Sequence, residues 1–200
     1  DIASAPGSKT TQMAQMMRNQ GLIVANDVDI DRVKALSNNI DRMGVVNVVI
    51  TILEGNRFGN LLPDYFDKVL VDAPCSALGT LSKNSEVLKW WGRGKIGRLM
   101  NTQKALIISG FDALKPGGLM VYSTCTLTPE ENEYVVNYLL EKRPKAKLLD
   151  FEIKGVVLSN GVKSWERFEF SEEILKCKRI DPISNDNFEG FFIALITKLP

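Results

Sequence analysis

The sequence contains no histidine, and this absence excludes much ordinary enzyme chemistry. Histidine is the usual general base near neutral pH and the commonest protein ligand of transition metals. Acid and base steps must therefore use carboxyl, thiol, lysine or tyrosine groups, and we expect no metal site. The three cysteines, Cys75, Cys125 and Cys177, are odd in number and far apart, so they do not form a disulfide framework and favour a reducing, cytoplasmic environment.

Long apolar runs are also lacking. No stretch reaches the roughly 20 residues of a membrane-spanning helix, the N-terminus does not resemble a signal peptide, and there is no internal repeat. A formal charge of +1 at pH 7 leaves nucleic-acid binding to a local patch, because the chain has no strong overall field. The 200 residues suit one globular domain, which we expect to be a monomer without membrane or metal partners.

Apolar runs and helical periodicities alternate along the chain up to residue 129. This alternation predicts a mostly parallel α/β sheet with helices on both faces, a Rossmann-like fold. The later part, up to residue 197, has no clear helix and predicts an antiparallel hairpin at one edge, although residues 155–176 allow no assignment. The expected strands cover 21–26, 45–53, 65–71, 119–123, 147–151 and 191–197. The expected helices cover 10–19, 30–43, 101–114 and 129–141.

Residues 119–133, LMVYSTCTLTPEENE, are the stretch around which a site is expected. They read as a buried strand, a turn that contains Cys125, and a helix start with Thr128 as N-cap and Glu131 completing a capping box. In an α/β sheet such a turn lies at the carboxyl edge, where ligands bind. A thiol beside a helix N-terminus is also biased toward the thiolate. Cys125 is thus either a nucleophile or, like most free cysteines, a small buried hydrophobe.

Other strand ends bring polar groups to the same edge. Residues 1–11, DIASAPGSKTT, form a small-residue loop that enters a helix, which suits an anion but lacks the spacing of a P-loop. An ordinary strand-to-helix turn is the alternative. Asp27 ends the next strand, where Rossmann-like folds hold a ribose diol, or it is a surface acid. Glu54 follows the third strand, and VDAPCS, residues 71–76, adds an acid, a proline and a second thiol.

Residues 78–103 are rich in lysine and arginine, with Trp90 and Trp91 interleaved. Basic side chains and aromatic rings can follow a phosphate backbone and stack on bases. A solvated loop with one tryptophan packed on the core is an equal alternative. Glycines near the middle are expected to keep the stretch flexible: Gly92, Gly94 and Gly97.

Several separated motifs agree with one known family. DIASAPGSKT, EGNRFG, VDAPCSALGT, YSTCTLTPEENE and the terminal RIDP and FEGFFIAL together resemble the Nop2/Sun family of S-adenosylmethionine-dependent RNA cytosine-5 methyltransferases. The resemblance covers nearly the whole chain, and the combination of DAPCS with STCTLxPEEN is highly specific. It implies S-adenosylmethionine as the cofactor and RNA as the partner, with ribosomal RNA the first candidate substrate and transfer RNA the second.

The resemblance also implies roles for individual residues. Cys125 would be the nucleophile, Cys75 would assist release of the product, Asp72 would lie near both cofactor and cytosine, and Lys9 would shape the catalytic pocket. The residues implied to contact the substrate are Pro74, Cys75 and Arg32. The residues implied to hold the cofactor are Ala3, Ser4, Ala5, Pro6, Gly7, Ser8, Lys9, Asp27, Glu54 and Asp72.

Three departures from the family pattern stand out. Position 54 is usually aspartate in the family, whereas this chain has the longer Glu54, and Ser4 and Ser8 replace the commoner alanine and glycine. The chain also begins at what reads as the last residue of a strand. We therefore expect residues 1–200 to form a methyltransferase domain, with its first strand and an N-terminal RNA-binding region upstream.

Two rival functions remain open. A DNA cytosine-5 methyltransferase would use the cysteine of the PC motif, commonly in a PCQ context, whereas this chain has PCS and a second cysteine. A cofactor-binding RNA scaffold without catalysis is the other rival, and the presence of both cysteines and Asp72 argues against it. Cys177 has no expected role beyond the core.

Overall fold

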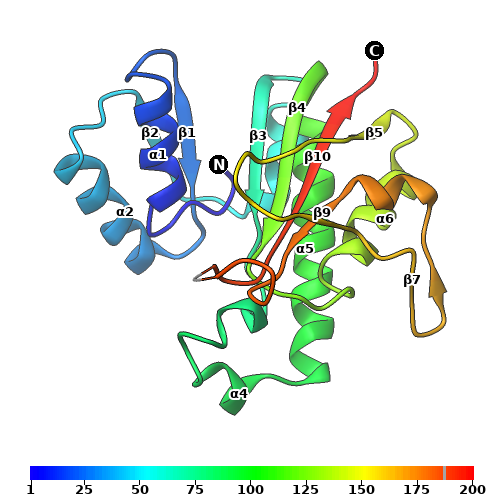
Figure 1. The fold of residues 1–200 in the computed structure, drawn as a ribbon. Helices are drawn as coiled ribbons and strands as arrows, with labels where there is room; N and C mark the ends of the chain where they lie inside the picture. The colour runs from blue at the N-terminus through cyan, green and yellow to red at the C-terminus, as the bar shows by residue number, and fades with distance from the viewer. Residues whose placement is uncertain (187) are drawn as a thin grey trace.

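Most strands of the chain lie side by side in one broad layer with helices on both faces, and residues 164–169 form a separate two-stranded hairpin (Figure 1). This computed structural model describes residues 1–186 and 188–200, and every side chain within them except that of Trp90. The predicted fold class, a Rossmann-like α/β sheet, is confirmed. The strands are β1 (Ile23–Asn26), β2 (Val48–Thr51), β3 (Phe66–Asp72), β4 (Leu114–Thr124), β5 (Ala146–Leu149), β6 (Ser159–Asn160), β7 (Ser164–Trp165), β8 (Phe168–Glu169), β9 (Lys178–Ile180) and β10 (Phe191–Lys198).

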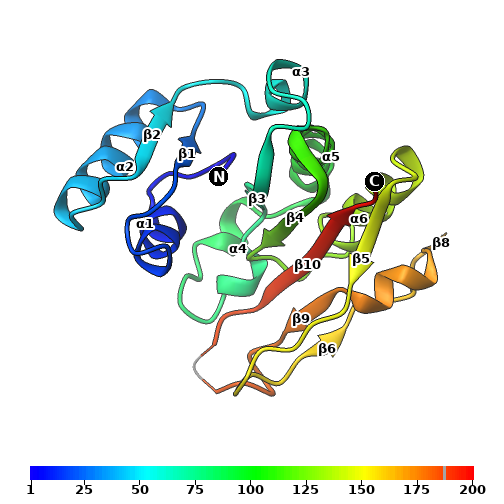
Figure 2. The ribbon, with the colours of Figure 1, turned by 90° about the horizontal axis from the view of Figure 1, so that it is seen from above.

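The helices divide between the two faces of this layer. Viewed from above, α1 and α2 lie on one side, and α3, α5 and α6 lie on the other (Figure 2). The α-helices are α1 (Ser8–Met16), α2 (Ile30–Arg42), α3 (Phe58–Leu61), α4 (Val87–Trp90), α5 (Arg93–Ala113) and α6 (Glu133–Lys142). Short 3-10 helices are η1 (Gly55–Arg57), η2 (Leu78–Thr80) and η3 (Glu172–Lys176).

The first half of the sheet is parallel. β1 pairs with β2, and β3 pairs with β4 in a register that sets Asp72 opposite Ser123. The backbone of residues 1 and 2 lies between β1 and β3, because the N–H of Asn26 donates to the carbonyl of Asp1 (2.9 Å) and the N–H of Ile2 to that of Leu70 (3.1 Å). The carboxyl ends of these strands therefore share one edge, as a ligand site in this fold requires.

The antiparallel part is larger than the predicted hairpin. β10 runs antiparallel to β4 on one side and to β9 and β5 on the other, and β9 also pairs with β6. Along β10 the buried residues alternate, with Phe192, Ala194 and Ile196 pointing into the main core. This period of two is what a strand with one covered face requires. Cys177 lies fully buried in the same core, as expected.

The helix that enters the main core begins earlier than predicted. α5 starts at Arg93 and contains Gly94 and Gly97, so the expected flexible stretch is largely helical. Glycine costs about 1 kcal/mol in a helix, but the burial of Ile96 offsets this local preference. The basic side chains before and within α5 form ion pairs, which are Lys83 with Glu189, Lys89 with Glu86 and Arg93 with Glu166. The expectation for the side chain of Trp90 lies outside the described residues.

The predicted capping box at Thr128 is wrong. The helix α6 begins at Glu133, not at Pro129, and Asn132 occupies the N-cap position. Residues 129–132 instead form a turn, in which the N–H groups of Asn132 and Tyr134 donate to the carbonyl of Pro129. The Glu131 side chain is not available for a cap, because distant donors bind its carboxylate.

Candidate active site

The two thiols singled out from the sequence meet at the carboxyl edge of the sheet. Cys75 follows β3, Cys125 follows β4, and their Sγ atoms lie 3.1 Å apart although 50 residues separate them in the chain. Both are free and partly exposed. Because β3 and β4 are neighbouring parallel strands, residues just past their ends are brought together by the register that pairs Asp72 with Ser123.

The contact between the sulfur atoms makes the two thiols unequal. The pKa of the Cys125 thiol is lowered, chiefly by the hydrogen bond that it accepts from Cys75, with Lys9 adding a smaller favourable charge effect. The pKa of the Cys75 thiol is raised, first by this same hydrogen bond and then by burial. Of the two thiols, Cys125 therefore loses its proton more readily, and the thiolate is the nucleophilic form.

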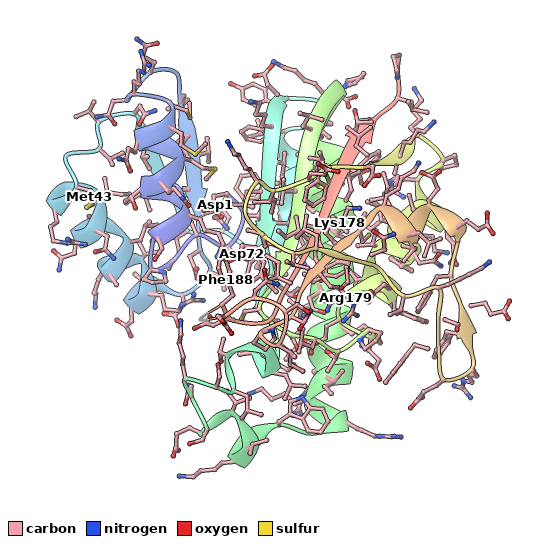
Figure 3. The ribbon with its side chains drawn as sticks, viewed as in Figure 1. Asp1, Met43, Asp72, Lys178, Arg179 and Phe188 are labelled. Atoms are coloured by element: carbon pink, nitrogen blue, oxygen red, sulfur yellow. The ribbon has the colours of Figure 1, made fainter. Side chains whose placement is uncertain are left out.

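Asp72 lies at the end of β3 (Figure 3), close enough to act electrostatically on the Cys125 thiol. Its Oδ2 accepts a 2.7 Å hydrogen bond from Nζ of Lys9, and its Oδ1 accepts one of the same length from the hydroxyl of Ser123. Nζ of Lys9 also lies 5.5 Å from the centre of the Phe191 ring. The Asp72 carboxylate and the Lys9 ammonium group thus both act electrostatically on the Cys125 thiol, and the Phe191 ring lies beside Lys9.

The loop of residues 3–8 connects this group to α1. Gly7 has a φ of 105°, and a Cβ atom there would lie 2.8 Å from the Leu36 side chain, so the loop takes a path that only glycine allows. The hydroxyl of Ser4 and the amide of Ala5 are not free: they donate to the carbonyl of Asn26 (2.9 Å) and to Oδ2 of Asp27 (3.1 Å). The loop is therefore held against the end of β1.

Asp27 and Arg32 belong to this loop cluster. Asp27 is 2% exposed, and its carboxylate accepts from the amides of Ala5 and Asp29 (3.1 Å each) and lies 3.5 Å from Nη1 of Arg32. Arg32 also donates to the carbonyl of Ala5. The contacts of Arg32 are thus with residues predicted to hold the cofactor, and its predicted contact with substrate stays a prediction. Asp27 has lone pairs left for a ribose, but much of its hydrogen bonding serves the loop.

Glu54 follows the end of β2 and is exposed. Its position depends on Asn26, a residue that the sequence analysis missed. The side-chain amide of Asn26 donates to the carbonyls of Ile2 and Leu53, and its oxygen accepts from the N–H of Leu53, all at 2.9 Å. This buried side chain of β1 therefore binds the backbone of Ile2 on one side and that of Leu53, just past β2, on the other. A polar residue at a strand end was its only signal in the sequence.

Pro74 and the segment after Cys75 are also fixed by residues that sequence reasoning did not assign. The Pro74 carbonyl accepts a 2.9 Å hydrogen bond from Nε2 of Gln103, and the predicted contact of Pro74 with the substrate stays a prediction. The N–H of Ser76 donates to Oε1 of Glu131 at 2.9 Å. Beyond them, a Cβ atom at Gly79 would lie 2.0 Å from the carbonyl oxygen of Gly190 and 2.8 Å from that of Cys125, so the backbone before β10 packs closely on Gly79 and Gly79 packs on the backbone of Cys125.

The arrangement suits covalent chemistry on a planar ring. It offers a thiol of lowered pKa, a second thiol, and acids at or just past the ends of three strands, one of which binds an ammonium group. Among the described residues, no helix combines the length and apolar character needed to cross a bilayer. Within that same part of the chain, no group of three or more cysteine, aspartate or glutamate side chains is placed to hold a metal ion.

Comparison with known proteins places this arrangement in one family. The chain matches the family model described as 16S rRNA methyltransferase RsmB/F over residues 1–197. It is 46% identical over 198 residues to the tRNA (cytosine(49)-C(5))-methyltransferase of Pyrococcus abyssi, covering 99% of this chain and 62% of that protein. It is 45% identical over 198 residues to the ribosomal RNA small subunit methyltransferase F of Aliivibrio fischeri, covering 99% of this chain and 40% of that protein.

Solved structures agree. The crystal structure of NSun6 from Pyrococcus horikoshii with SFG, an S-adenosylmethionine analogue, matches with a TM-score of 0.83 at 34% identity and covers 99% of this chain and 47% of that one. This chain thus spans less than two thirds of the length of each of these relatives. With a family model matched over residues 1–197, the chain belongs to the RsmB/F methyltransferases, the Nop2/Sun family that its motifs resemble.

Proposed function

We propose that this chain is the catalytic domain of an RNA methyltransferase that forms 5-methylcytosine. The observation that carries the proposal is the 3.1 Å contact between the sulfur atoms of Cys75 and Cys125, beside the Asp72 carboxylate. Attack and release in a covalent mechanism are separate tasks, and two thiols of unequal pKa suit one task each.

The donor set at the sheet edge fits S-adenosylmethionine. The acids Asp27, Glu54 and Asp72 follow or end three neighbouring strands, which suits a ligand with hydroxyl groups and positive charge. The Oδ1 atom of Asp1 is buried and has no hydrogen-bond partner among the described residues, so this edge retains an unused acceptor. We assign the loop of residues 3–9 to the methionine part, Asp27 to the ribose and Glu54 to the adenine. When bound, this cofactor supplies an electrophilic methyl group.

Cys125 begins the reaction. Its thiolate forms a bond to C6 of the cytosine, which makes C5 electron-rich and able to accept a methyl group. Negative charge develops at N3 during this addition, and a proton taken up from solvent and held between N3 and the Asp72 carboxylate would balance it. The Lys9 ammonium and the Ser123 hydroxyl orient that carboxyl through their 2.7 Å hydrogen bonds.

Cys75 acts in the release step. After C5 is methylated, a water molecule takes the C5 proton and the electron pair of that bond restores the C5–C6 double bond. The bond between C6 and the Cys125 sulfur breaks at the same time, which returns its electron pair to that sulfur. A thiol that donates a hydrogen bond to the Cys125 sulfur stabilises it as a leaving thiolate. The cytosine must be presented out of its stack, from a single-stranded region or by flipping.

Ribosomal RNA is the substrate that we put first, because the matching family model and the relative from Aliivibrio fischeri are described as ribosomal RNA methyltransferases. Transfer RNA is the second candidate, supported by the 46% identity to the tRNA enzyme of Pyrococcus abyssi. The Phe191 ring beside Lys9 offers a face for the target base, and the cavity of about 330 Å³ that it lines with Phe188 and Lys83 is open to an RNA strand.

The direct test uses methyl-tritiated S-adenosylmethionine. The protein is incubated separately with unmodified 16S ribosomal RNA and with unmodified transfer RNA, and the RNA is digested to nucleosides. Label in 5-methylcytidine supports the proposal, and the RNA that is labelled identifies the substrate class. Label in 5-methyldeoxycytidine from a DNA control would support the DNA enzyme instead. The absence of label from every nucleic acid would favour a non-catalytic scaffold.

A further inference from the structure

The carboxylate of Glu131 is fully buried where two active-site segments meet. We define the Cys75 loop as residues 73–77 and the Cys125 turn as residues 125–131. Oε1 of Glu131 accepts from the N–H of Ser76 (2.9 Å) and from Nε2 of Gln103 (2.9 Å), and Oε2 accepts from the hydroxyl of Thr128 (2.7 Å). One side chain of the Cys125 turn therefore binds the Cys75 loop and α5 together.

Gln103 completes the connection from α5. Its side chain is fully buried, and Nε2 donates both to Oε1 of Glu131 and to the carbonyl of Pro74, at 2.9 Å each. The two neighbours of Cys75 in the chain are thus both held: Pro74 by Gln103, and Ser76 by Glu131. The hydroxyls of Ser76 and Thr126, 2.8 Å apart, add a third link between loop and turn.

The Cys125 turn is itself anchored to the core. The hydroxyl of Tyr122, a fully buried residue of β4, donates to the backbone carbonyl of Glu131 at 2.6 Å. Glu131 therefore has a fixed backbone as well as a fully bonded carboxylate. A buried carboxylate is costly unless it is hydrogen-bonded, and an apolar side chain would fill the same space at a lower desolvation cost. What the carboxylate adds is the fixed position of its three donors.

We infer that Glu131 and Gln103 are positioning residues that hold the Cys75 loop against the Cys125 turn and thereby set the separation of the two thiols. Among the hydrogen bonds of the described residues, those of both side chains go to groups other than sulfur, so each acts through the backbone on either side of Cys75. We call the hydrogen bonds of Glu131 and Gln103 to the Cys75 loop the clamp. The consequence for catalysis rests on the proposed function: loss of the clamp slows the release step more than the attack step, because release needs Cys75 beside Cys125.

A disulfide trap measures the thiol separation without RNA or cofactor. The azo oxidant diamide takes up two electrons and two protons from the Cys75 and Cys125 thiols, which forms their S–S bond and reduces the N=N bond to a hydrazine. Peptide mapping of the product, which is lighter by two hydrogens, assigns the bridge and times its formation. The test variants are Gln103→Met, which removes both donated hydrogen bonds at similar volume, and Glu131→Ala.

Two further variants control for stability and chemistry. Glu131→Gln keeps an oxygen that accepts from Ser76 and Gln103, so it should restore trapping. Ser109 lies on the same helix and is also buried, and Ser109→Ala also loses two hydrogen bonds, from the N–H of Gly59 (3.0 Å) and to the carbonyl of Gly55 (2.8 Å). The hydrogen-bond partners of Ser109 lie in neither the Cys75 loop nor the Cys125 turn, so the disulfide should form at the wild-type rate in Ser109→Ala.

We expect trapping to slow by about tenfold or more in Gln103→Met and Glu131→Ala, since a misplacement of about 1 Å has effects of this size or larger. The alkylation of Cys125 should also need a higher pH in these two variants. The inference is overturned if the disulfide forms in Gln103→Met at the wild-type rate, or if its formation slows as much in Ser109→Ala as in Gln103→Met. If Glu131→Ala does not fold, Gln103→Met decides alone. Methylation that is absent even from the wild type counts against the proposed function and leaves the trapping result to decide the clamp.

Discussion

Lys9 donates a 2.7 Å hydrogen bond to Oδ2 of Asp72, across 63 residues of sequence. Lys9 comes from the first turn of α1, which follows the predicted cofactor loop, and Asp72 ends β3 beside the thiols. This contact is the physical connection between the part of the site assigned to the cofactor and the part assigned to the cytosine. It also leaves Oδ1 of Asp72 to the Ser123 hydroxyl, so both oxygens of the carboxylate are oriented.

Substitution of Asp72 tests the role of this carboxylate. Asp72→Asn keeps the shape of the side chain but cannot hold or release a proton at the cytosine, so methyl transfer should fall by about a hundredfold or more. Asp67→Asn is a matched control on the same strand, because Asp67 is exposed and its ion pair, with Lys115 at 2.7 Å, lies away from the thiols in sequence and is at the surface. Initial rates of methyl transfer measure both. Equal activity in the two variants would show that Asp72 has no catalytic role.

The pH dependence of alkylation tests the assignment of the thiolate. The lowered pKa of Cys125 means that its thiolate persists below the ordinary cysteine value of about 8.5. The rate of carbamidomethylation of Cys125, followed by mass spectrometry, should therefore rise with a midpoint below this pH. In Cys75→Ala the largest cause of the shift is removed, and the midpoint should move upward. A midpoint that does not move would mean that Cys75 does not activate Cys125.

The close approach at Gly79 predicts a specific glycine requirement. In Gly79→Ala the new Cβ would lie 2.0 Å from the carbonyl oxygen of Gly190 and 2.8 Å from that of Cys125, so backbone must shift. We expect a loss of about 1–3 kcal/mol in the free energy of unfolding, together with reduced methyl transfer.

Gly94→Ala is the counterpart on α5, where a Cβ atom meets nothing within 4 Å. It should raise the free energy of unfolding by about 1 kcal/mol, because alanine favours the helix. Urea denaturation measures both changes, and a destabilisation of equal size in the two variants would contradict the packing account.

A buried ion pair holds the far side of the Cys125 turn. Arg179 on β9 (Figure 3) donates twice to the fully buried carboxylate of Glu133, at 2.6 Å each, and once to the carbonyl of Leu127 at 3.0 Å. Arg179→Leu leaves that carboxylate without its cation and should cost about 3–5 kcal/mol of unfolding free energy.

Arg143 provides the comparison, because it also binds a carboxylate, that of Asp112, with two hydrogen bonds of 2.6 and 2.7 Å. Both side chains of that pair are about one-third exposed, so water can replace the lost contact. Arg143→Leu should therefore cost only about 1 kcal/mol or less. Similar costs in chemical denaturation of the two variants would argue that burial does not determine the strength of these pairs.

Sequence patterns were sufficient for the features that depend on local periodicity. Alternating strands and helices predicted the sheet, and parallel neighbours predicted that thiols after two strand ends would meet, as Cys75 and Cys125 do. The number of antiparallel strands was underestimated, because the pairing of β10 with β5 and β9 depends on residues far apart in the sequence.

The errors have the same physical origin. The Thr128 and Glu131 pair has the local pattern of a capping box, but Glu131 is bound by Ser76 and Gln103, which lie 55 and 28 residues away. Likewise, the glycines near the start of α5 have weak helix preference, which tertiary packing overrides. Local patterns identify elements, whereas the partners of a buried polar side chain are fixed only by the complete fold.

The central claim, attack by Cys125 and release by Cys75, is tested most directly by covalent adducts. Wild-type protein, Cys75→Ser and Cys125→Ser are each incubated with unmodified RNA and S-adenosylmethionine and then resolved on a denaturing gel. We predict that Cys75→Ser accumulates a protein–RNA adduct, that Cys125→Ser forms none, and that the wild type turns over with little adduct. An adduct that forms in Cys125→Ser and is lost in Cys75→Ser would contradict the account, because it would make Cys75 the nucleophile.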